Sequence, residues 1–192
     1  MFKRVETDWE LARFNDIWTT VWKEKGYELE YSDEVLERYV AIAGDGTIAG
    51  TAEIKPYRLN GSAINRVAPF ARHPKIADNP GQVAEIDKMA VLPQYRGKLV
   101  SDLLSSAVYC AERYRFRYFV SLLEPVFFRA LRISYRVPME KIGEKTYYKG
   151  DDVIPVIFEM EEIYTHKSKY DWLVPARLPE ALAPASLNRR AQ

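Results

Sequence analysis

One stretch of the chain, residues 83–123, limits the possible folds more than any other. A strand-like apolar segment is ended by Pro93, a turn follows at Gly97, an amphipathic helix comes next, and a second apolar strand closes the stretch. The predicted elements are Val83–Leu92, Leu99–Arg115 and Tyr118–Leu123. A strand–helix–strand connection within one sheet is almost always right-handed with parallel strands. The stretch therefore predicts a parallel strand pair joined by a helix.

The remaining elements predict a mixed α/β sheet. Thr7-Asp8-Trp9-Glu10 has the spacing of a capping box, and a helix is expected from there to about Lys25. Gly44-Asp45-Gly46 is a hairpin turn between two expected strands. The other predicted segments are a short helix at 33–39, strands at 39–43 and 47–55, a short strand at 66–71, a helix at 125–133, a loop at 147–152 and a last strand at 153–160, where Pro155 indicates an edge or a bulge. A mixed sheet (α+β) with helices on both faces follows.

Length and charge restrict the class of protein. The 192 residues suffice for one domain, and a net charge of +1 gives no overall electrostatic attraction for nucleic acid or an anionic membrane. The single cysteine, Cys110, cannot form an internal disulfide, and no apolar run has the length of a signal or membrane segment. We expect a cytoplasmic protein with one domain at 1–163. A partly flexible C-terminal extension is expected at 164–192, with a homodimer left open.

The turn at residues 93–98 has the chemistry of an anion site. The first amides of a helix have no backbone partners, and the helix dipole favours negative charge near them. Gly97 permits close approach of a ligand, while Arg96 and Lys98 add positive charge. The segment predicts a site of pyrophosphate size, with an ordinary solvated basic turn as the alternative.

This segment resembles the acyl-CoA signature of the GNAT (Gcn5-related N-acetyltransferase) superfamily, Gln/Arg-x-x-Gly-x-Gly/Ala. Gln94, Arg96 and Gly97 agree with the signature, whereas Leu99 occupies a position where Gly or Ala is usual. The resemblance covers about residues 39–160. It implies a mostly antiparallel sheet with a splayed central parallel strand pair, and an acyltransferase that uses acetyl-CoA or another acyl-CoA. A metal is not expected, because His73 and His166 are the only histidines and both lie in predicted loops.

The resemblance also implies a donor site. The pantetheine arm would lie between the splayed strands and bond main-chain groups near Met89 and Val91. The residues implied at the pyrophosphate are Gln94, Arg96, Gly97, Lys98, Leu99, Val100 and Ser101. The acceptor would be an amine of a small molecule or a peptide.

A branch of this superfamily is a closer comparison. Glu85-x-x-Lys88-Met89-Ala90-Val91 is similar to a strand of autoinducer synthases and long-chain N-acyl amino acid synthases, which commonly take acyl groups from acyl carrier protein. Such a synthase would need a deep apolar groove beside the splayed strands and a basic patch for its acidic carrier. Arg113, Arg115 and Arg117 are candidates for that patch, or for a solvated face. An acetyltransferase would instead have a short, closed acyl pocket.

Acyl transfer to an amine requires a proton acceptor. Glu85 is the candidate general base, and Asp87 lies on the same strand face, where it could share that role or bind the substrate amine. A salt bridge is the structural alternative for both carboxylates. The tyrosine acid common in GNAT enzymes is replaced by Ala130. Together with Leu99 and Ser134, this departure supports a non-catalytic acyl-CoA sensor as a further alternative.

Overall fold

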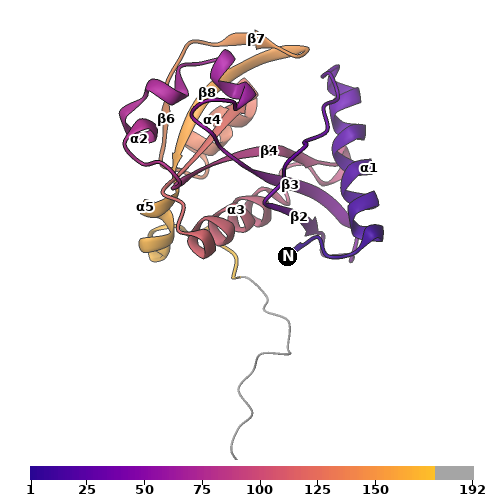
Figure 1. The fold of residues 1–192 in the computed structure, drawn as a ribbon. Coiled ribbons are helices and arrows are strands. Elements are labelled where there is room, and N and C mark those ends of the chain that lie inside the picture. The colour runs from indigo at the N-terminus through magenta and orange to yellow at the C-terminus, as the bar shows by residue number, and fades with distance from the viewer. Residues whose placement is uncertain (176–192) are drawn as a thin grey trace, which may run out of the picture.

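The computed structural model describes residues 1–175 and has a mixed sheet in the order β1-β2-β3-β4-β5-β8-β6, with β7 paired to β8 (Figure 1). The strands are β1 (Phe2–Arg4), β2 (Glu37–Ile42), β3 (Ile48–Pro56), β4 (Val83–Val91), β5 (Tyr118–Leu123), β6 (Met139–Lys141), β7 (Thr146–Tyr148) and β8 (Asp151–Glu159). The α-helices are α1 (Asp8–Lys25), α2 (Pro74–Ala77), α3 (Val100–Tyr114), α4 (Pro125–Ile133) and α5 (Met160–Thr165). Only β4 and β5 pair in parallel within this part of the chain, which confirms the predicted fold class.

Local signals explain where α1 begins and ends. The Thr7 hydroxyl accepts a hydrogen bond from the Glu10 amide, and the Glu10 carboxylate accepts one from the Thr7 amide, so the predicted capping box is formed. Gly26 ends the helix in the left-handed region at φ 78°. The buried stripe of α1 lies over β2, β3 and β4 and consists of Phe14, Ile17, Trp18 and Val21.

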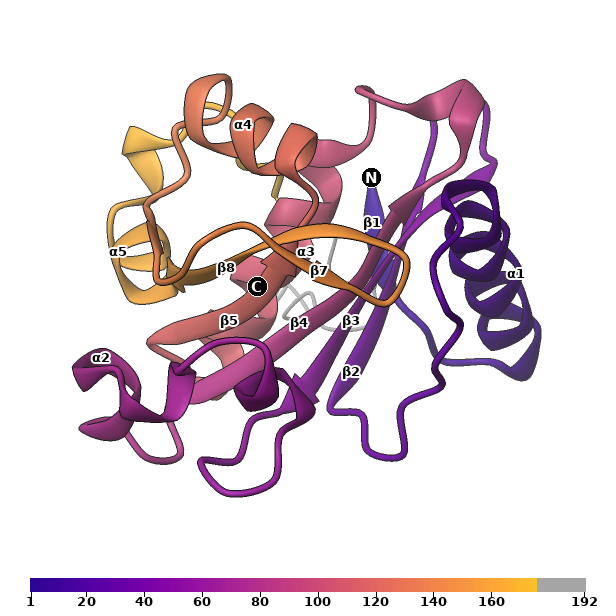
Figure 2. The same ribbon diagram turned by 90° about the horizontal axis from the view of Figure 1, so that it is seen from above.

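The sheet has a helical layer on each face (Figure 2). Helix α1 and the segment 57–80, which includes α2, cover one face, here called the front face. Helices α3, α4 and α5 pack on the opposite face around Phe119 and Phe158. Side chains alternate along β4, so Ile86 enters the core beneath α3 while Glu85 faces the front.

The parallel strands β4 and β5 are paired over three residues only, from Val83–Tyr118 to Glu85–Val120. Beyond this point the strands separate, which confirms the predicted splay. The Ser121 hydroxyl donates to the Ile86 carbonyl at 3.0 Å, one position past the last pair. Glu85 is therefore the last paired residue of β4 and lies at the apex of the opening.

A β-bulge interrupts β4 just past the apex. Asp87 pairs with Glu53 and Ala90 with Thr51, so Lys88 and Met89 together oppose the single residue Ala52. Lys88 has φ 46°, and its carbonyl accepts a hydrogen bond from the Thr51 hydroxyl at 2.8 Å. The bulge turns Lys88 to the same face as Asp87, although the two are adjacent in sequence.

Four local predictions are wrong. Residues 33–36 are irregular and Glu37 begins β2, where its side chain is buried against α3 by Arg113 and Tyr114, so no helix forms at 33–39. The segment 66–71 contains short 3₁₀ turns, because Ile64 and Phe70 fill a core pocket in place of pairing with a strand. Residues 147–152 belong to the β7–β8 hairpin, whose turn at Lys149 and Gly150 has positive φ. The last strand is not an edge strand, because β8 pairs with β5 on one side and with β6 and β7 on the other. Pro155 is tolerated there because it lies in the gap between the β6 and β7 pairings. The short strands β1 and β6 are not predicted.

The β7–β8 hairpin reaches across the front face toward the end of α1 (Figure 2). At its tip the Glu28 amide donates to the Lys149 carbonyl at 3.0 Å, and the Tyr27 hydroxyl donates to Asp151 at 3.3 Å. A Cβ atom at Gly150 would collide with the Gly26 carbonyl, so the contact requires glycine. The hairpin thus forms a strap over the region of the apex.

The chain continues past α5 along the back of the molecule. Trp172 is buried among core residues, and the Val174 amide donates to Ser105 of α3 at 2.8 Å. The remainder of the extension expected at 164–192, from residue 176 onward, lies outside the described residues. Within the described part of the chain, every helix is too short or too polar to cross a bilayer.

Candidate active site

The apex of the splayed strands holds a cluster of three charged side chains. Lys55, near the end of β3, places its Nζ 2.8 Å from Glu85 Oε1 and 2.8 Å from Asp87 Oδ2. The Glu85 side chain is only 14% exposed. The structure therefore brings Glu85 and Asp87 together on one face, as their alternation predicts, and adds a lysine between them.

The two carboxylates differ in proton affinity. Burial raises the pKa of Glu85, and the charges of Lys55 and Lys88 only partly offset this effect. Burial acts on Asp87 in the same direction, but Lys55 and Lys88 outweigh it and lower the Asp87 pKa. Glu85 is thus the better proton acceptor of the pair, and Asp87 remains an anion.

Sequence reasoning missed the groups that surround Glu85. The sequence predicts Lys55 only as the last residue of a strand, and the β3–β4 register that brings it to Glu85 has no local signal. Burial raises the pKa of Tyr57 and of Tyr148, and the Glu85 charge adds to both shifts. The Tyr57 hydroxyl donates to Asn65 at 2.7 Å. Tyr148 belongs to the hairpin that crosses the front face, so nothing in its own sequence neighbourhood marks it.

Contacts with the β2–β3 turn and with α1 hold the predicted anion-binding turn in place. The Tyr95 hydroxyl donates to Asp45 of the β2–β3 turn at 2.7 Å, and Arg96 pairs with Glu24 of α1 at 2.8 Å. Gly97 has φ 77° and open space where a Cβ would be. The turn is therefore held in place by its neighbours while its glycine faces free volume.

Backbone amides are available on both sides of this turn. Within residues 1–175, the amides of Val100, Ser101 and Asp102 donate no hydrogen bond, and the first bond of α3 runs from Leu103 to Leu99. The Leu92 amide donates to Ala49 of β3 at 2.9 Å, so by alternation the Val91 N–H points toward the splayed side. An anion at the start of α3 could accept hydrogen bonds from the amides of Val100, Ser101 and Asp102. A carbonyl group in the splay could accept one from the Val91 N–H.

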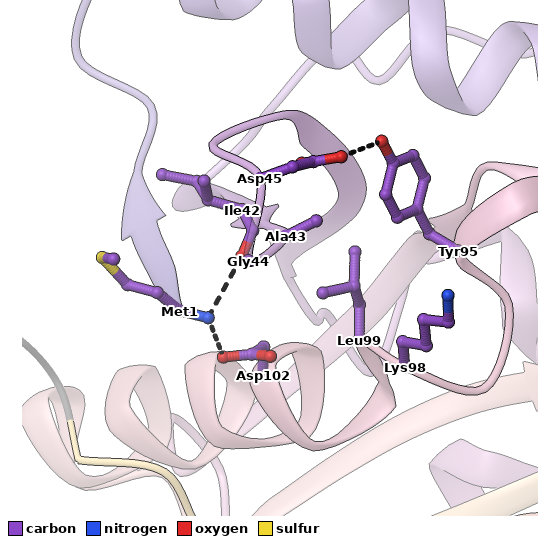
Figure 3. A pocket seen from close by; sticks show the side chains of 9 residues that line it. All are labelled: Met1, Ile42, Ala43, Gly44, Asp45, Tyr95, Lys98, Leu99 and Asp102. Carbon is purple, nitrogen blue, oxygen red and sulfur yellow. Dashed lines mark hydrogen bonds and ion pairs between the residues drawn. The ribbon is translucent and has the colours of Figure 1, made fainter.

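Leu99 departs from the family signature without blocking the turn. Its side chain is buried in an apolar cluster with Ala49 and Leu103. Lys98 and Leu99 line a pocket of about 310 Å³ beside the turn (Figure 3). Its other lining residues are Met1, Ile42, Ala43, Gly44, Asp45, Tyr95 and Asp102. Gln94, Arg96 and Gly97 lie outside this lining.

A second, apolar cavity of about 20 Å³ lies behind the splay, between β4, β5 and α3. Ile86 and Met89 line it on the β4 side, and Trp172 lines it on the side of the C-terminal segment. The volume is about that of one water molecule. As formed by residues 1–175, this cavity is far smaller than the deep apolar groove expected of a long-chain synthase.

Most arginines of the predicted carrier-binding patch are engaged in ion pairs. Arg113 pairs with the buried Glu37, and Arg117 pairs with Glu161, so two of the three predicted patch arginines are already in ion pairs.

Ala130, at the expected position of the tyrosine acid, is half-buried on α4. Burial raises the pKa of Cys110 to about 12, which keeps its thiol protonated. Among residues 1–175, no group of three or more His, Cys, Asp or Glu side chains is arranged to hold a metal ion.

Comparisons with known proteins agree with this geometry. The family model described as "Acetyltransferase (GNAT) family" matches residues 7–124, more than half of the chain. The family match and the fold therefore define an acyltransferase. The chain belongs to the GNAT family. A comparison with curated proteins finds no match.

Solved structures share the fold at low sequence identity. FeeM, an N-acyl amino acid synthase from uncultured soil microbes, is 14% identical with a TM-score of 0.68, over 86% of this chain and 93% of FeeM. The AHL synthase LasI is 17% identical with a TM-score of 0.59, over 93% and 97% of the chains. Spermidine N-acetyltransferase from Vibrio cholerae, solved with CoA and spermine, is 11% identical with a TM-score of 0.58, over 85% and 97%. At these identities the similarities show a shared fold, which synthases and an acetyltransferase have in common.

Proposed function

We propose that this protein transfers an acyl group from a phosphopantetheine thioester to an amine, with Glu85 as the general base. The observation that carries the proposal is the largely buried Glu85 carboxylate at the apex of the splay, on the strand that runs to the free amides of α3. The amine nitrogen attacks the thioester carbonyl carbon, the C–S bond breaks, and an amide forms. Glu85 takes the amine proton, and the departing thiolate takes a proton from solvent.

Donor binding is assigned to the main chain. The pantetheine arm would bond backbone groups near Met89 and Val91, and the Val91 N–H would stabilise the oxyanion. The pyrophosphate would meet the amides at the start of α3, with the basic side chains of Arg96 and Lys98 nearby. The amine acceptor, from a small molecule or a peptide, would approach Glu85 on the front face between α1 and the segment 57–80.

The size of the apolar cavity favours a short acyl group. An acetyl group is small, whereas a long chain would need many times the 20 Å³ found behind the splay. We therefore propose acetyl-CoA or another short acyl-CoA as the donor.

Donor binding is tested by thermal unfolding with CoA, acetyl-CoA and a long-chain acyl-CoA. At a concentration of about 100 Kd, a ligand that binds only the folded state adds about 2.7 kcal/mol, or about 5–10 °C in Tm for this chain length. Acetyl-CoA should give this shift and the long-chain donor a smaller one. Gly97→Asp should abolish the shift, since it places a carboxylate at the anion site.

Gly81→Asp is the matched control for this experiment. Gly81 also has a positive φ, 79°, and open space around its Cβ position, but it lies before the start of β4. The control should keep the CoA shift. Absence of any shift with CoA compounds in the wild type would contradict a CoA donor. Binding of CoA without thiol release in the presence of amino acids, diamines or polyamines would instead support the sensor alternative.

A second candidate donor, acyl carrier protein, is favoured by one observation on α4. This helix begins two residues after β5 ends and exposes Val126 and Ile133, which are 74% and 67% accessible. In the described chain, Arg129, Arg132 and Arg136 on and after α4 form no ion pair. An acidic carrier would match this basic and apolar surface.

Charge reversal of Arg129, Arg132 and Arg136 to glutamate tests whether the carrier protein docks here. We expect the rate with an acylated carrier protein to fall by about tenfold or more at low salt, since electrostatic steering is lost. Turnover of acetyl-CoA should be unchanged, and Lys141→Glu, an exposed site on β6, should affect neither donor. Equal rates for the triple variant and the wild type with the carrier would exclude this docking surface.

A further inference from the structure

A continuous row of alternating charges crosses the front face beneath α1. In order across the sheet, the row consists of Arg38, Glu53, Lys88, Asp87, Lys55 and Glu85. Three cations and three anions alternate, so the row is neutral as a whole. It ends at Glu85, the apex residue, and it exists because the bulge turns Lys88 and Asp87 to the same face.

Lys55 is the residue of this row that links Glu85 to Asp87. Its ammonium contacts one carboxylate on each side at 2.8 Å, and only 20% of its side chain is exposed. Asp87 Oδ2 is shared with a second cation, because Lys88 Nζ lies 3.8 Å from the same oxygen atom. Glu85 therefore competes with Asp87 for Lys55, while Asp87 has an additional cation of its own.

This competition suits a general base. With Lys55 absent, the largely buried Glu85 carboxyl group would stay protonated near neutral pH and could not accept the proton of the amine. With Lys55 bound to Glu85 alone, the carboxylate would be stabilised as an anion and would be a weaker proton acceptor. A lysine that contacts both carboxylates gives Glu85 a proton affinity between these two cases.

We propose that Lys55 and Asp87 are positioning residues that hold the Glu85 carboxylate at the apex and set its strength as a proton acceptor. This inference rests on the proposed function, in which Glu85 removes the acceptor proton. Neither residue needs to touch the reacting atoms. Lys55 acts through its ion pair with Glu85, and Asp87 acts through Lys55.

Several other charged or titratable groups lie near Glu85 at the apex. They are Tyr57 after β3, Lys88 on β4 and Tyr148 on β7, with Arg66 acting on Tyr148. Burial is the largest influence on the Glu85 pKa and raises it, Lys55 and Lys88 lower it, and Asp87 raises it. Removal of Lys55 and removal of Asp87 should consequently move the titration of Glu85 in opposite directions.

The test is an NMR titration of protein labelled with ¹³C at the glutamate side-chain carboxyl, with the Glu85 signal assigned as the one lost in Glu85→Gln. In Lys55→Met the midpoint should move to higher pH by about 1–3 units, since a close opposite charge is removed. In Asp87→Asn it should move to lower pH. Lys145→Met, at an exposed ion pair with Asp152, should leave it unchanged.

Activity provides a second, independent readout. Turnover at pH 7 should fall at least tenfold in Lys55→Met and recover largely in Lys55→Arg, which keeps the charge. Midpoints that stay in place, or that move in the same direction in both variants, would overturn the proposal. If Lys55→Met does not fold, Asp87→Asn and Lys55→Arg still decide the question. If Glu85→Gln retains turnover, the proposed base is wrong, yet the titrations still report whether Lys55 and Asp87 set the state of this carboxylate.

Discussion

Replacement of Glu85 by glutamine is expected to lower kcat by about 10²–10⁴-fold, the range typical of a lost general base. The amide has the size of the carboxylate but cannot accept the amine proton. Lys55 keeps Asp87 as a partner at 2.8 Å, so the variant should remain folded. The measurement is the rate of thiol release from acetyl-CoA with the amine that gives the fastest wild-type turnover.

The pH dependence of kcat shows whether Glu85 acts in its deprotonated form. Glu85 is active only when deprotonated, so the wild-type rate falls on the acid side as this group takes up a proton. Because burial raises the Glu85 pKa, that decline should lie above the ordinary glutamate value of 4.5. The decline should be absent from the residual rate of Glu85→Gln.

Glu140→Gln is the control for this prediction. Glu140 is also a strand carboxylate paired with a lysine, Lys75 at 2.8 Å, but it lies on β6 at the edge of the sheet. Its replacement should leave kcat unchanged. Wild-type turnover in Glu85→Gln, with acetyl-CoA binding retained, would show that another group or solvent accepts the proton.

Replacement of Glu53 by leucine is expected to destabilise the fold by about 3–5 kcal/mol, the usual cost of leaving one member of a buried ion pair alone. Glu53 pairs with Lys88 and with Arg38, the latter at 2.7 Å, and its side chain is 1% exposed. The Lys88 side chain is 2% exposed and lies over the Trp18 ring. Lys88 would keep only Ser32 and, at 3.8 Å, Asp87.

Urea unfolding of single and double variants measures this effect. The double variant Glu53→Leu/Lys88→Met replaces both buried charges by apolar groups and should recover much of the lost stability. Glu34→Leu removes one member of an exposed pair with Arg58 and should have little effect. A Glu53→Leu protein as stable as the wild type, or a double variant no better than the single one, would contradict the role assigned to this pair.

Local sequence signals identified the elements that form the donor side of the site. Pro93 ends a strand, Gly97 permits the turn, and the amphipathic segment that follows forms α3 within one residue of its predicted bounds at each end. These signals depend on backbone preferences of single residues and on apolar spacing, both of which are properties of a short segment. The same reasons account for the capping box of α1.

Predictions failed where distant partners decide the local structure. Residues 33–39 carry acceptable helix signals, but Glu37 and Tyr39 pair with β3, and α3 side chains hold the Glu37 carboxylate. The hairpin of β7 and β8 likewise depends on Gly150 meeting Gly26, residues on separate elements. Tertiary pairing outweighs weak local propensity in both segments.

The sequence by itself determined the order of the main elements, the turn with its free amides, and Glu85 and Asp87 as carboxylates on one strand face. Only the tertiary structure placed Lys55 between those carboxylates and joined them to Lys88 and Glu53. The physical reason is strand register. A bulge of one residue in β4 sets which β3 side chains lie opposite Glu85, and register is a property of two paired strands, which neither strand encodes alone.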